Sequence, residues 1–350
     1  MRIAQIAPLT ESVPPRTYGG TERVVSYLTE ELVAMGHDVT LFASGDSVTS
    51  AELEAVWPCA LRFDDNLRDA IAPQMLLMET VCQRAHEFDV LHCHLDYLPF
   101  SLFSRQPTPF ITTLHGRLDL PELDRIYGCF EHVPLVSISN AQRRPMPRGN
   151  FISTVYHGLP TDLLTPRPMA RDYLAFLGRI CPEKSPDRAI RIARAAGMKL
   201  KIAAKVDRVD HAYFETTIRP LIDGDQIEMI GEIGDAEKSA FLSGARALLL
   251  PIDWPEPVGL VMIEAMACGT PTVAFPAGSV PEVIDNGITG FIVNDEAAAV
   301  VALSQLDRLS AAAIRTRFEQ RFSARRMAED YLALYRRLAL HARPALRVVT

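Results

Sequence analysis

The sequence lacks the features that would indicate a secreted protein, a membrane-spanning protein or a protein stabilised by a structural metal ion. Its six cysteines are scattered over 350 residues and no two form a CxxC pair, so we expect reduced thiols. The N-terminal stretch has no charged, apolar and cleavage regions of a signal peptide, and no apolar run is long enough to cross a membrane. These absences predict a cytoplasmic protein without a transmembrane segment.

The chain also lacks an excess of positive charge. Lys and Arg number 36 against 43 Asp and Glu, and the resulting net charge of −7 argues against nucleic acid as a partner. Arg143, Arg144 and Arg148 form a local basic cluster, which a solvated loop explains better than a binding site. His92 and His94 would share one face of a strand while Cys93 points to the other, so the sequence predicts no metal site there.

Apolar strands and amphipathic helices alternate, and this order repeats once at the scale of a domain. The pattern predicts two doubly wound α/β domains, residues 1–165 and 170–323, joined by a Pro-rich linker near 159–171. An amphipathic helix over about 324–340 could pack on either domain. Predicted strands are 3–7, 39–43, 90–94, 110–114, 134–139, 173–177, 200–204, 228–230, 247–251 and 272–275. Predicted helices end at residue 36 and span about 69–88, 186–196, 213–221, 237–245 and 260–267.

One stretch, EPVGLVMIEAMACGTPTVA, places two glutamates around the start of a helix. The first-turn amides at Gly259, Leu260 and Val261 have no intrahelical partner, so they can bind a phosphate or diphosphate. Glu264 lies about 7–8 Å further along the helix axis, a spacing that suits hydrogen bonds to an attached ribose. Because its neighbours are apolar, the Glu264 carboxylate needs a partner. Glu256, in the loop before the helix, faces the end of the bound ligand opposite to the ribose.

This pair of glutamates, with GSVPEVIDNGITGFIV after it, closely resembles the retaining family 4 glycosyltransferases of the GT-B fold. LGRICPEK resembles the family's Gly-Arg motif with a Lys five residues on, and TTLHG resembles its strand-end motif with a His. YGGTERVVSYLTEELVAMGHDVTLFA resembles its first glycine loop and helix. Together the motifs cover nearly the whole chain. The resemblance implies two facing Rossmann-like domains with the active site in the cleft between them.

The resemblance also implies an activity and its residues. A hexose would pass from a nucleotide-diphosphate sugar to a hydroxyl acceptor, with retained configuration, by front-face displacement, and without a metal or cofactor. Arg179 and Lys184 would stabilise the leaving diphosphate, Glu256 would hold sugar hydroxyls, and His115 would contact the donor sugar. The expected donor-binding residues are Gly19, Gly20, Ile233, Gly259, Leu260, Val261 and Glu264.

The identities of both substrates are less defined. UDP-hexose is the first choice of donor and GDP-mannose the second. A small-molecule, glycan or lipid-linked acceptor would be held by the loops at 8–18, 96–103 and 117–127. Two positions depart from the family pattern. Val258 stands where Phe is common, and Lys205, where a small residue is common, either adds a phosphate contact or is solvated.

Three other classes of function compete with transfer. A sugar-nucleotide epimerase or a sugar phosphorylase would share the GT-B fold. An NAD-dependent oxidoreductase would share Rossmann-like halves, but no GxGxxG follows the first strand. A catalytically inactive nucleotide-sugar binding module would keep the same site residues without turnover.

Overall fold

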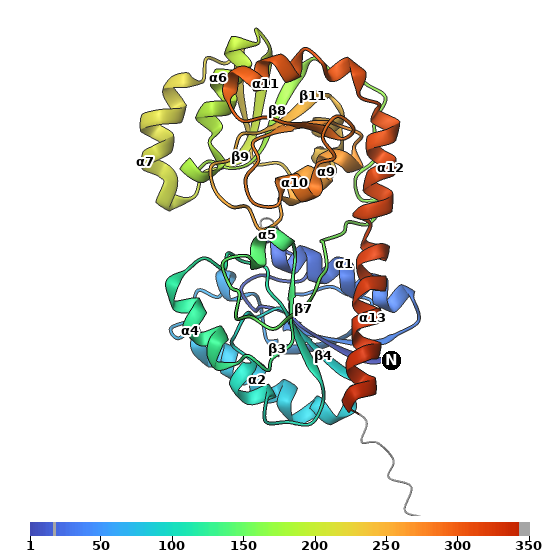
Figure 1. Ribbon diagram of the computed structural model, residues 1–350. Coiled ribbons are helices and arrows are strands. Elements are labelled where there is room, and N and C mark those ends of the chain that lie inside the picture. Colours follow the sequence, from blue (N-terminus) through green and yellow to red (C-terminus); the bar gives the residue numbers. More distant parts are fainter. Residues whose placement is uncertain (17–18, 343–350) are drawn as a thin grey trace, which may run out of the picture. The chain divides into compact units, whose positions relative to one another are not determined.

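The computed structural model describes residues 1–16 and 19–342, which form two compact units (Figure 1). The first unit holds Met1–Gly158 and the C-terminal helix α13 (Ala324–Ala342), and the second holds Leu159–Ser323. Thr17 and Tyr18, part of the first loop expected to hold an acceptor, lie outside the described residues. Each unit is described by itself below.

A parallel sheet of seven strands forms the centre of the first unit, in the order β3-β2-β1-β4-β5-β6-β7. The strands are β1 (Arg2–Ile6), β2 (Asp38–Ser44), β3 (Glu52–Trp57), β4 (Val90–Cys93), β5 (Phe110–Thr113), β6 (Leu135–Ser137) and β7 (Phe151–Thr154). The helices besides α13 are α1 (Gly20–Ala34), α2 (Ile71–Arg84), α3 (Phe100–Phe103), α4 (Pro121–Cys129) and α5 (Asn140–Arg143).

Helix α1 shows how the sequence sets an element. Val24, Val25, Leu28 and Leu32 recur at helical spacing and are buried, so they pack toward the sheet. Gly36 follows with a φ of 82°, a left-handed conformation that glycine adopts readily and that ends the helix. Helix α13 packs against α1 and β4.

The second unit repeats the plan with six parallel strands in the order β10-β9-β8-β11-β12-β13. They are β8 (Tyr173–Arg179), β9 (Lys199–Lys205), β10 (Ile227–Gly231), β11 (Ala245–Leu250), β12 (Thr272–Ala274) and β13 (Gly290–Ile292). The helices are α6 (Pro186–Ala195), α7 (His211–Tyr213), α8 (Asp235–Ser243), α9 (Leu260–Ala267), α10 (Val280–Val283), α11 (Glu296–Leu303) and α12 (Ala311–Arg321).

Both sheets reverse their strand order at one place, between β1 and β4 in the first unit and between β8 and β11 in the second. In doubly wound sheets the loops that leave the carboxyl ends of the strands at this switch point diverge, and ligands bind in the space between them. The strand order therefore marks the loops after β8 and β11 as the expected binding site of the second unit.

The structure differs from the sequence-based expectation at several elements. Strands β3, β7 and β13, which lie at sheet edges, were not predicted, because β3 carries charged residues and the other two are short segments with mostly half-buried side chains. The equally short β6 and β12 are fully buried. The helix expected around 213–221 is present, but it begins at His211 and is irregular. After α7 comes a π-helical stretch, Phe214–Ile218, and then a 3₁₀ turn, Arg219–Leu221. Pro220 lies in that turn, and its missing N–H prevents a regular α-helical ending.

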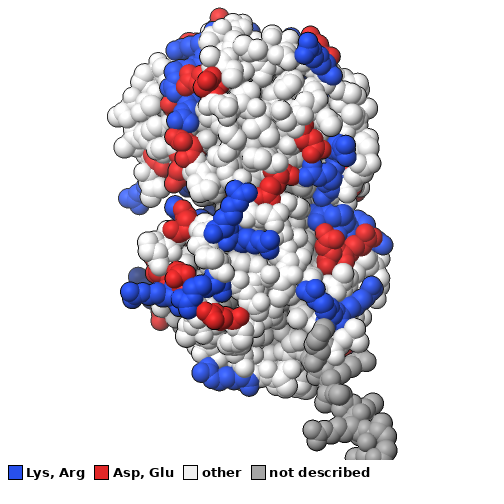
Figure 2. All heavy atoms as spheres, in the orientation of Figure 1, with Lys and Arg blue, Asp and Glu red and all other residues white. Residues whose placement is uncertain are grey.

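Charges on the surface are largely paired. Figure 2 shows acidic and basic side chains interspersed over much of the face it presents. Of the basic cluster noted in the sequence, Arg148 pairs with Glu131 at 2.9 Å and lies 3.9 Å from Asp124. Among the helices that the structure describes, none has both the length and the apolar character needed to cross a membrane.

Candidate active site

The loops after β8 and β11 are tied together at the switch point of the second unit. Arg179 is the last residue of β8, and Lys184 ends the short 3₁₀ turn that follows. The Asp253 N–H, in the loop after β11, donates to the Glu183 carbonyl at 3.0 Å. This bond brings the segment that carries Glu256 next to the segment that carries Lys184.

Glu256 is held by two side chains from these loops. Its carboxylate pairs with the Lys184 ammonium and accepts a hydrogen bond from Nε1 of Trp254 at 3.0 Å. The Lys184 Nζ also lies 5.4 Å from the centre of the Trp254 ring, within cation–π range. Glu256 is only 7% exposed, so the nearby cation is what makes a charged carboxylate stable there. Trp254 was not singled out from the sequence.

The loop after β12 fixes the backbone of Glu256. The Ser279 N–H donates to the Glu256 carbonyl at 2.9 Å. A Cβ added to Gly278 would lie 2.3 Å from both the backbone N and O of Glu256, and Gly278 has a φ of 55°. Only glycine therefore allows this close approach of the two loops.

Helix α9 carries the second glutamate. Glu264 is 7% exposed, and its Oε1 lies 2.6 Å from Nζ of Lys238, which also pairs with Asp235 at 3.2 Å. Lys238 belongs to α8, and sequence reasoning required a partner for Glu264 without identifying it. At the other end of α9, Arg315 of α12 donates to the Ala267 carbonyl at 2.7 Å. A cation there satisfies a free carbonyl and favours the helix dipole.

Carboxylates surround Arg179. Its guanidinium lies 3.4 Å from Asp207, 3.8 Å from Asp210 and 3.7 Å from Glu183. Lys205, the last residue of β9, pairs with Asp207 at 3.1 Å. The end of β9 therefore meets the end of β8 in one network of opposite charges, which sequence reasoning did not identify.

The remaining donor-binding candidates occupy loops and helix starts. Ile233 lies half-buried between β10 and α8, while Gly259 is the N-cap of α9, followed by Leu260 and Val261 in its first turn. In the first unit, Gly19 caps α1 and Gly20 begins it. The space around these two glycines differs. A Cβ on Gly19 would lie 2.7 Å from Cβ of Pro15, whereas one on Gly20 would meet nothing within 4 Å. Val258 is buried.

His115 follows β5 in the first unit, on a loop that a buried side chain clamps. The Gln142 amide nitrogen donates to the Leu114 and Gly116 carbonyls, both at 2.8 Å, on either side of His115. The Gln142 oxygen accepts from the Ile138 N–H at 2.9 Å. The clamp was not predicted, because nothing in the sequence marks a glutamine in the segment SNAQRR as buried.

Three further histidines surround His115 and are buried. Nδ1 of His94 lies 2.9 Å from Nε2 of His115, the ring of His157 stacks on that of His115 at 5.2 Å, and His92 lies 4.1 Å from His94 between ring centres. Across residues 1–16 and 19–342, no group of three or more His, Cys, Asp or Glu side chains is arranged to hold a metal ion. The cluster is instead a hydrogen-bonded core.

These histidines predict acid-sensitive stability. Burial lowers the pKa of His92, His94 and His157 well below the usual range and that of His115 to about 3, so all four are neutral in the folded chain at pH 7. Unfolding restores a pKa near 6.5. The unfolded chain therefore binds more protons below about pH 6.5, and the stability present above that pH is lost as the pH falls.

Each such histidine steepens this loss by up to roughly 1.4 kcal/mol per pH unit. Urea denaturation between pH 5 and 8 measures it, and we expect the decline to begin near pH 6.5. His211→Gln is the control, because the His211 side chain is 66% exposed and should not alter the curve. A free energy of unfolding that stays constant from pH 8 to 5 would contradict buried neutral histidines.

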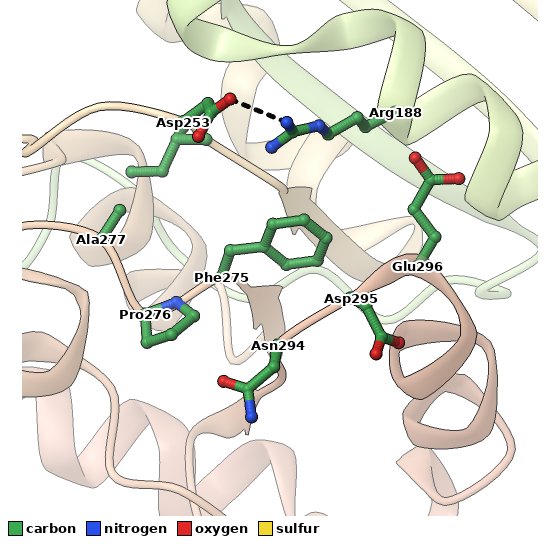
Figure 3. Close-up of a pocket in the computed structure, with 9 residues that line it drawn as sticks. Arg188, Asp253, Phe275, Pro276, Ala277, Asn294, Asp295 and Glu296 are labelled. Atoms are coloured by element: carbon green, nitrogen blue, oxygen red, sulfur yellow. Dashed lines mark hydrogen bonds and ion pairs between the residues drawn. The ribbon is translucent and has the colours of Figure 1, made fainter.

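A separate pocket of about 460 Å³ lies beyond the carboxyl ends of β11, β12 and β13 (Figure 3). Arg188 reaches from α6 toward Asp253, with Nη2 2.7 Å from Oδ2, and lies 5.7 Å from the centre of the Phe275 ring. None of the individual catalytic or donor-binding residues expected from the sequence lines it. The lining residues are Arg188, Ile252, Asp253, Phe275, Pro276, Ala277, Asn294, Asp295 and Glu296.

Known proteins share this fold and parts of this sequence. The chain is 30% identical over 276 residues to the D-inositol 3-phosphate glycosyltransferase of Mycolicibacterium smegmatis, a match that covers 69% of this chain and 60% of that relative. The matched part of the chain thus spans less than two thirds of the length of this relative, and 45% of the length of the D-inositol 3-phosphate glycosyltransferase of Mycolicibacterium paratuberculosis.

Two solved structures show the fold at lower identity. The sucrose-phosphate synthase of Thermosynechococcus elongatus superposes with a TM-score of 0.79 at 19% identity, covering 97% of this chain and 99% of that one. Anabaena HepE, solved in complex with UDP and glucose, gives a TM-score of 0.72 at 17% identity, covering 95% and 99%. The predicted GT-B fold of two Rossmann-like units is therefore confirmed.

Family models extend this likeness along the sequence. The model described as Glycosyltransferase Family 4 matches residues 18–184, and the model described as Glycosyl transferases group 1 matches residues 165–321. The first match contains the glycine loop and the His115 motif, and the second contains both glutamates. The chain therefore belongs to the family 4, group 1 glycosyltransferases.

Proposed function

We propose that this protein transfers a hexose from a nucleotide-diphosphate sugar, with UDP-hexose as the first choice, to a hydroxyl acceptor. The observation that carries the proposal is the switch point of the second unit, where Arg179, Lys184, Glu256 and the start of α9 stand on two loops joined by a backbone hydrogen bond. Anabaena HepE, solved with UDP and with UDP-glucose, supports a uridine nucleotide as the donor.

The diphosphate would bind where positive charge and free amides meet. The first-turn amides of Leu260 and Val261 point out from the N-terminus of α9, and Arg179 and Lys184 supply two fixed cations. Both cations have carboxylate partners in the structure. When the donor binds, its diphosphate would replace the carboxylates as the anionic partner of both cations. Before the donor binds, the carboxylates hold the two cationic side chains in place.

The two glutamates would bind the ends of the donor. Once Lys184 turns to the diphosphate, the Glu256 carboxylate can accept hydrogen bonds from sugar hydroxyls while Trp254 still orients it. Glu264 would accept from the ribose hydroxyls, and Lys238 balances its charge throughout. An ionised carboxylate accepts hydrogen bonds and cannot donate them, which suits both glutamates to hydroxyl groups that donate.

We propose front-face displacement with retained configuration. The bond from the anomeric carbon to the diphosphate oxygen breaks, and the acceptor oxygen bonds to that carbon on the same face. The acceptor's hydroxyl proton passes to the leaving phosphate oxygen. Arg179, Lys184 and the α9 amides act by stabilising the charge that develops on the diphosphate, without a metal ion in our proposal.

The first test is thermal-shift binding across UDP, GDP, ADP, NAD and the corresponding sugar nucleotides. We expect the uridine series to raise the melting temperature of the wild type, and Arg179→Ala and Glu264→Ala to lose that increase. Arg191→Ala is the matched control, because Arg191 pairs with Glu296 away from these loops and should leave the shift unchanged. Stabilisation by NAD alone would contradict the proposal and favour an oxidoreductase.

Turnover separates transfer from the other activities that share this fold. Incubation with the stabilising donor and a panel of small-molecule, glycan and lipid-linked hydroxyl acceptors should release free nucleoside diphosphate. An NMR spectrum of the product should show the donor's anomeric configuration. Release of sugar 1-phosphate would indicate a phosphorylase, an altered sugar nucleotide would indicate an epimerase, and binding without any turnover would indicate an inactive binding module.

A further inference from the structure

A buried glutamine joins two hydrogen-bond chains beneath His115. Gln5, in β1, is fully buried, and its amide oxygen lies 2.9 Å from Nε2 of His94. Its amide nitrogen donates to the Tyr335 hydroxyl of α13 at 3.1 Å. Because one amide group has a donor on one side and an acceptor on the other, its orientation sets the direction of both chains.

The first chain runs from Gln5 to His115. An amide oxygen can only accept, so Nε2 of His94 carries the hydrogen. His94 is neutral, because burial keeps its pKa well below the usual range, and its Nδ1 is therefore an acceptor. Nε2 of His115, 2.9 Å from that nitrogen, must then be the donor. A neutral His115 ring with hydrogen on Nε2 keeps a lone pair on Nδ1.

The second chain agrees with this orientation. With the Gln5 amide donating to it, the Tyr335 hydroxyl is free to donate to Nδ1 of His92 at 2.6 Å. Nε2 of His92 then donates to Thr113 at 2.7 Å, and the Thr113 hydroxyl donates to Tyr331 at 2.8 Å. Tyr335, His92 and Thr113 each use a donor and an acceptor in one direction, and Tyr331 is the last acceptor of the chain.

Reversing the Gln5 amide would reverse both chains and put a hydrogen on Nδ1 of His115. Within the described part of the chain, that nitrogen is buried and has no hydrogen-bond partner. Buried N–H groups without an acceptor are rarer in proteins than acceptors that are under-used. The unpartnered Nδ1 therefore favours the lone pair over the hydrogen at this position.

We propose that Gln5 and His94 are positioning residues that hold His115 as its Nε2–H tautomer, so that Nδ1 carries a lone pair that can accept from a ligand hydroxyl once the side chains that bury this nitrogen move aside. A sugar hydroxyl is the group that would donate to it, and this last step rests on the proposed function. The assignment of the His115 tautomer does not depend on the proposed function. The two residues that determine which nitrogen of His115 carries the hydrogen therefore lie on β1 and directly after β4.

The test is the tautomer of His115, read from long-range ¹H–¹⁵N correlation spectra of protein with ¹⁵N-labelled histidine, without any nucleotide. His115→Gln identifies the ring's signals by their loss. We expect the wild type at pH 7.5 to show an unprotonated Nδ1 and a protonated Nε2. The opposite assignment would overturn the proposal, and once His115→Gln has identified the ring's signals the wild-type spectrum decides without any rate measurement.

Two variants then separate the positioning role from packing. Gln5→Met keeps volume but removes the amide, so we expect a mixture of His115 tautomers and a three- to tenfold loss of kcat/KM with the donor, the effect of one hydrogen bond. Thr113→Val interrupts only the second chain and should leave the His115 tautomer unchanged. A His115 tautomer that is the same in Gln5→Met as in the wild type would overturn the role of Gln5.

The spectra also keep the two proposals distinct. If no nucleotide sugar binds or turns over, the function proposed for the second unit fails while the tautomer assignment stands. If turnover is found but His115 carries its hydrogen on Nδ1, only the inference about Gln5 and His94 fails.

Discussion

Lys184→Met is expected to lower kcat/KM with the donor sugar nucleotide by about 10²–10³-fold, because it removes a fixed cation from the leaving diphosphate. The same change leaves the nearly buried Glu256 carboxylate without its charged partner, so we also expect the free energy of unfolding to fall by about 2 kcal/mol. Initial rates of nucleoside diphosphate release and urea denaturation measure the two effects.

Two further variants show whether charge or packing is responsible. Lys184→Arg keeps the charge and should recover part of both losses. Lys199→Met removes a lysine whose side chain is 62% exposed and whose acidic partner is 4.0 Å away, so rate and stability should stay near the wild type. A Lys184→Met enzyme that keeps its full rate would remove Lys184 from the diphosphate site.

The second large effect is expected from one added methyl group. In Gly278→Ala the new Cβ would meet the Glu256 backbone at 2.3 Å, in a residue whose φ of 55° already disfavours a side chain. The loops after β11 and β12 must then separate. We expect the free energy of unfolding to fall by roughly 3 kcal/mol, and kcat/KM to fall as well because Glu256 is displaced. Thermal denaturation and initial rates check these outcomes.

Gly287→Ala is the matched control for Gly278→Ala. Gly287 also has a positive φ, 79°, but a Cβ there would meet no atom within 4 Å. It should therefore show only the backbone strain of about 1–2 kcal/mol, and its kcat/KM should be unchanged. Equal effects of the two substitutions on stability and rate would mean that contact with Glu256 does not matter.

The parallel-sheet pattern made much of the second unit predictable. Arg179 ends β8 and Glu256 follows β11, and because these neighbouring parallel strands end at the same edge, the loops after them come together. Lys238 and Gln5 could not be found in this way. Each is a common polar residue whose partner lies far away in sequence, and only packing determines that Lys238 meets Glu264 and that Gln5 meets Tyr335.

Strands at the edges of the sheets were also harder to predict from the sequence. β3, with sequence ELEAVW, has no buried residue and lies at the end of its sheet, so its apolar pattern is weak and its pairing depends on β2. Strands with two neighbours, such as β8 and β11, are apolar on both faces and stand out in the sequence. Sequence therefore indicates the middle of each sheet better than its borders.

The place of α13 in the first unit has a consequence for how the chain is made. Tyr331 and Tyr335 complete the hydrogen bonds of Gln5, His92 and Thr113, yet the ribosome adds them after the whole of Leu159–Ser323. The second unit is an uninterrupted stretch and can close its sheet as soon as it emerges. Of the two units, the one whose synthesis starts first is thus the last to finish its core.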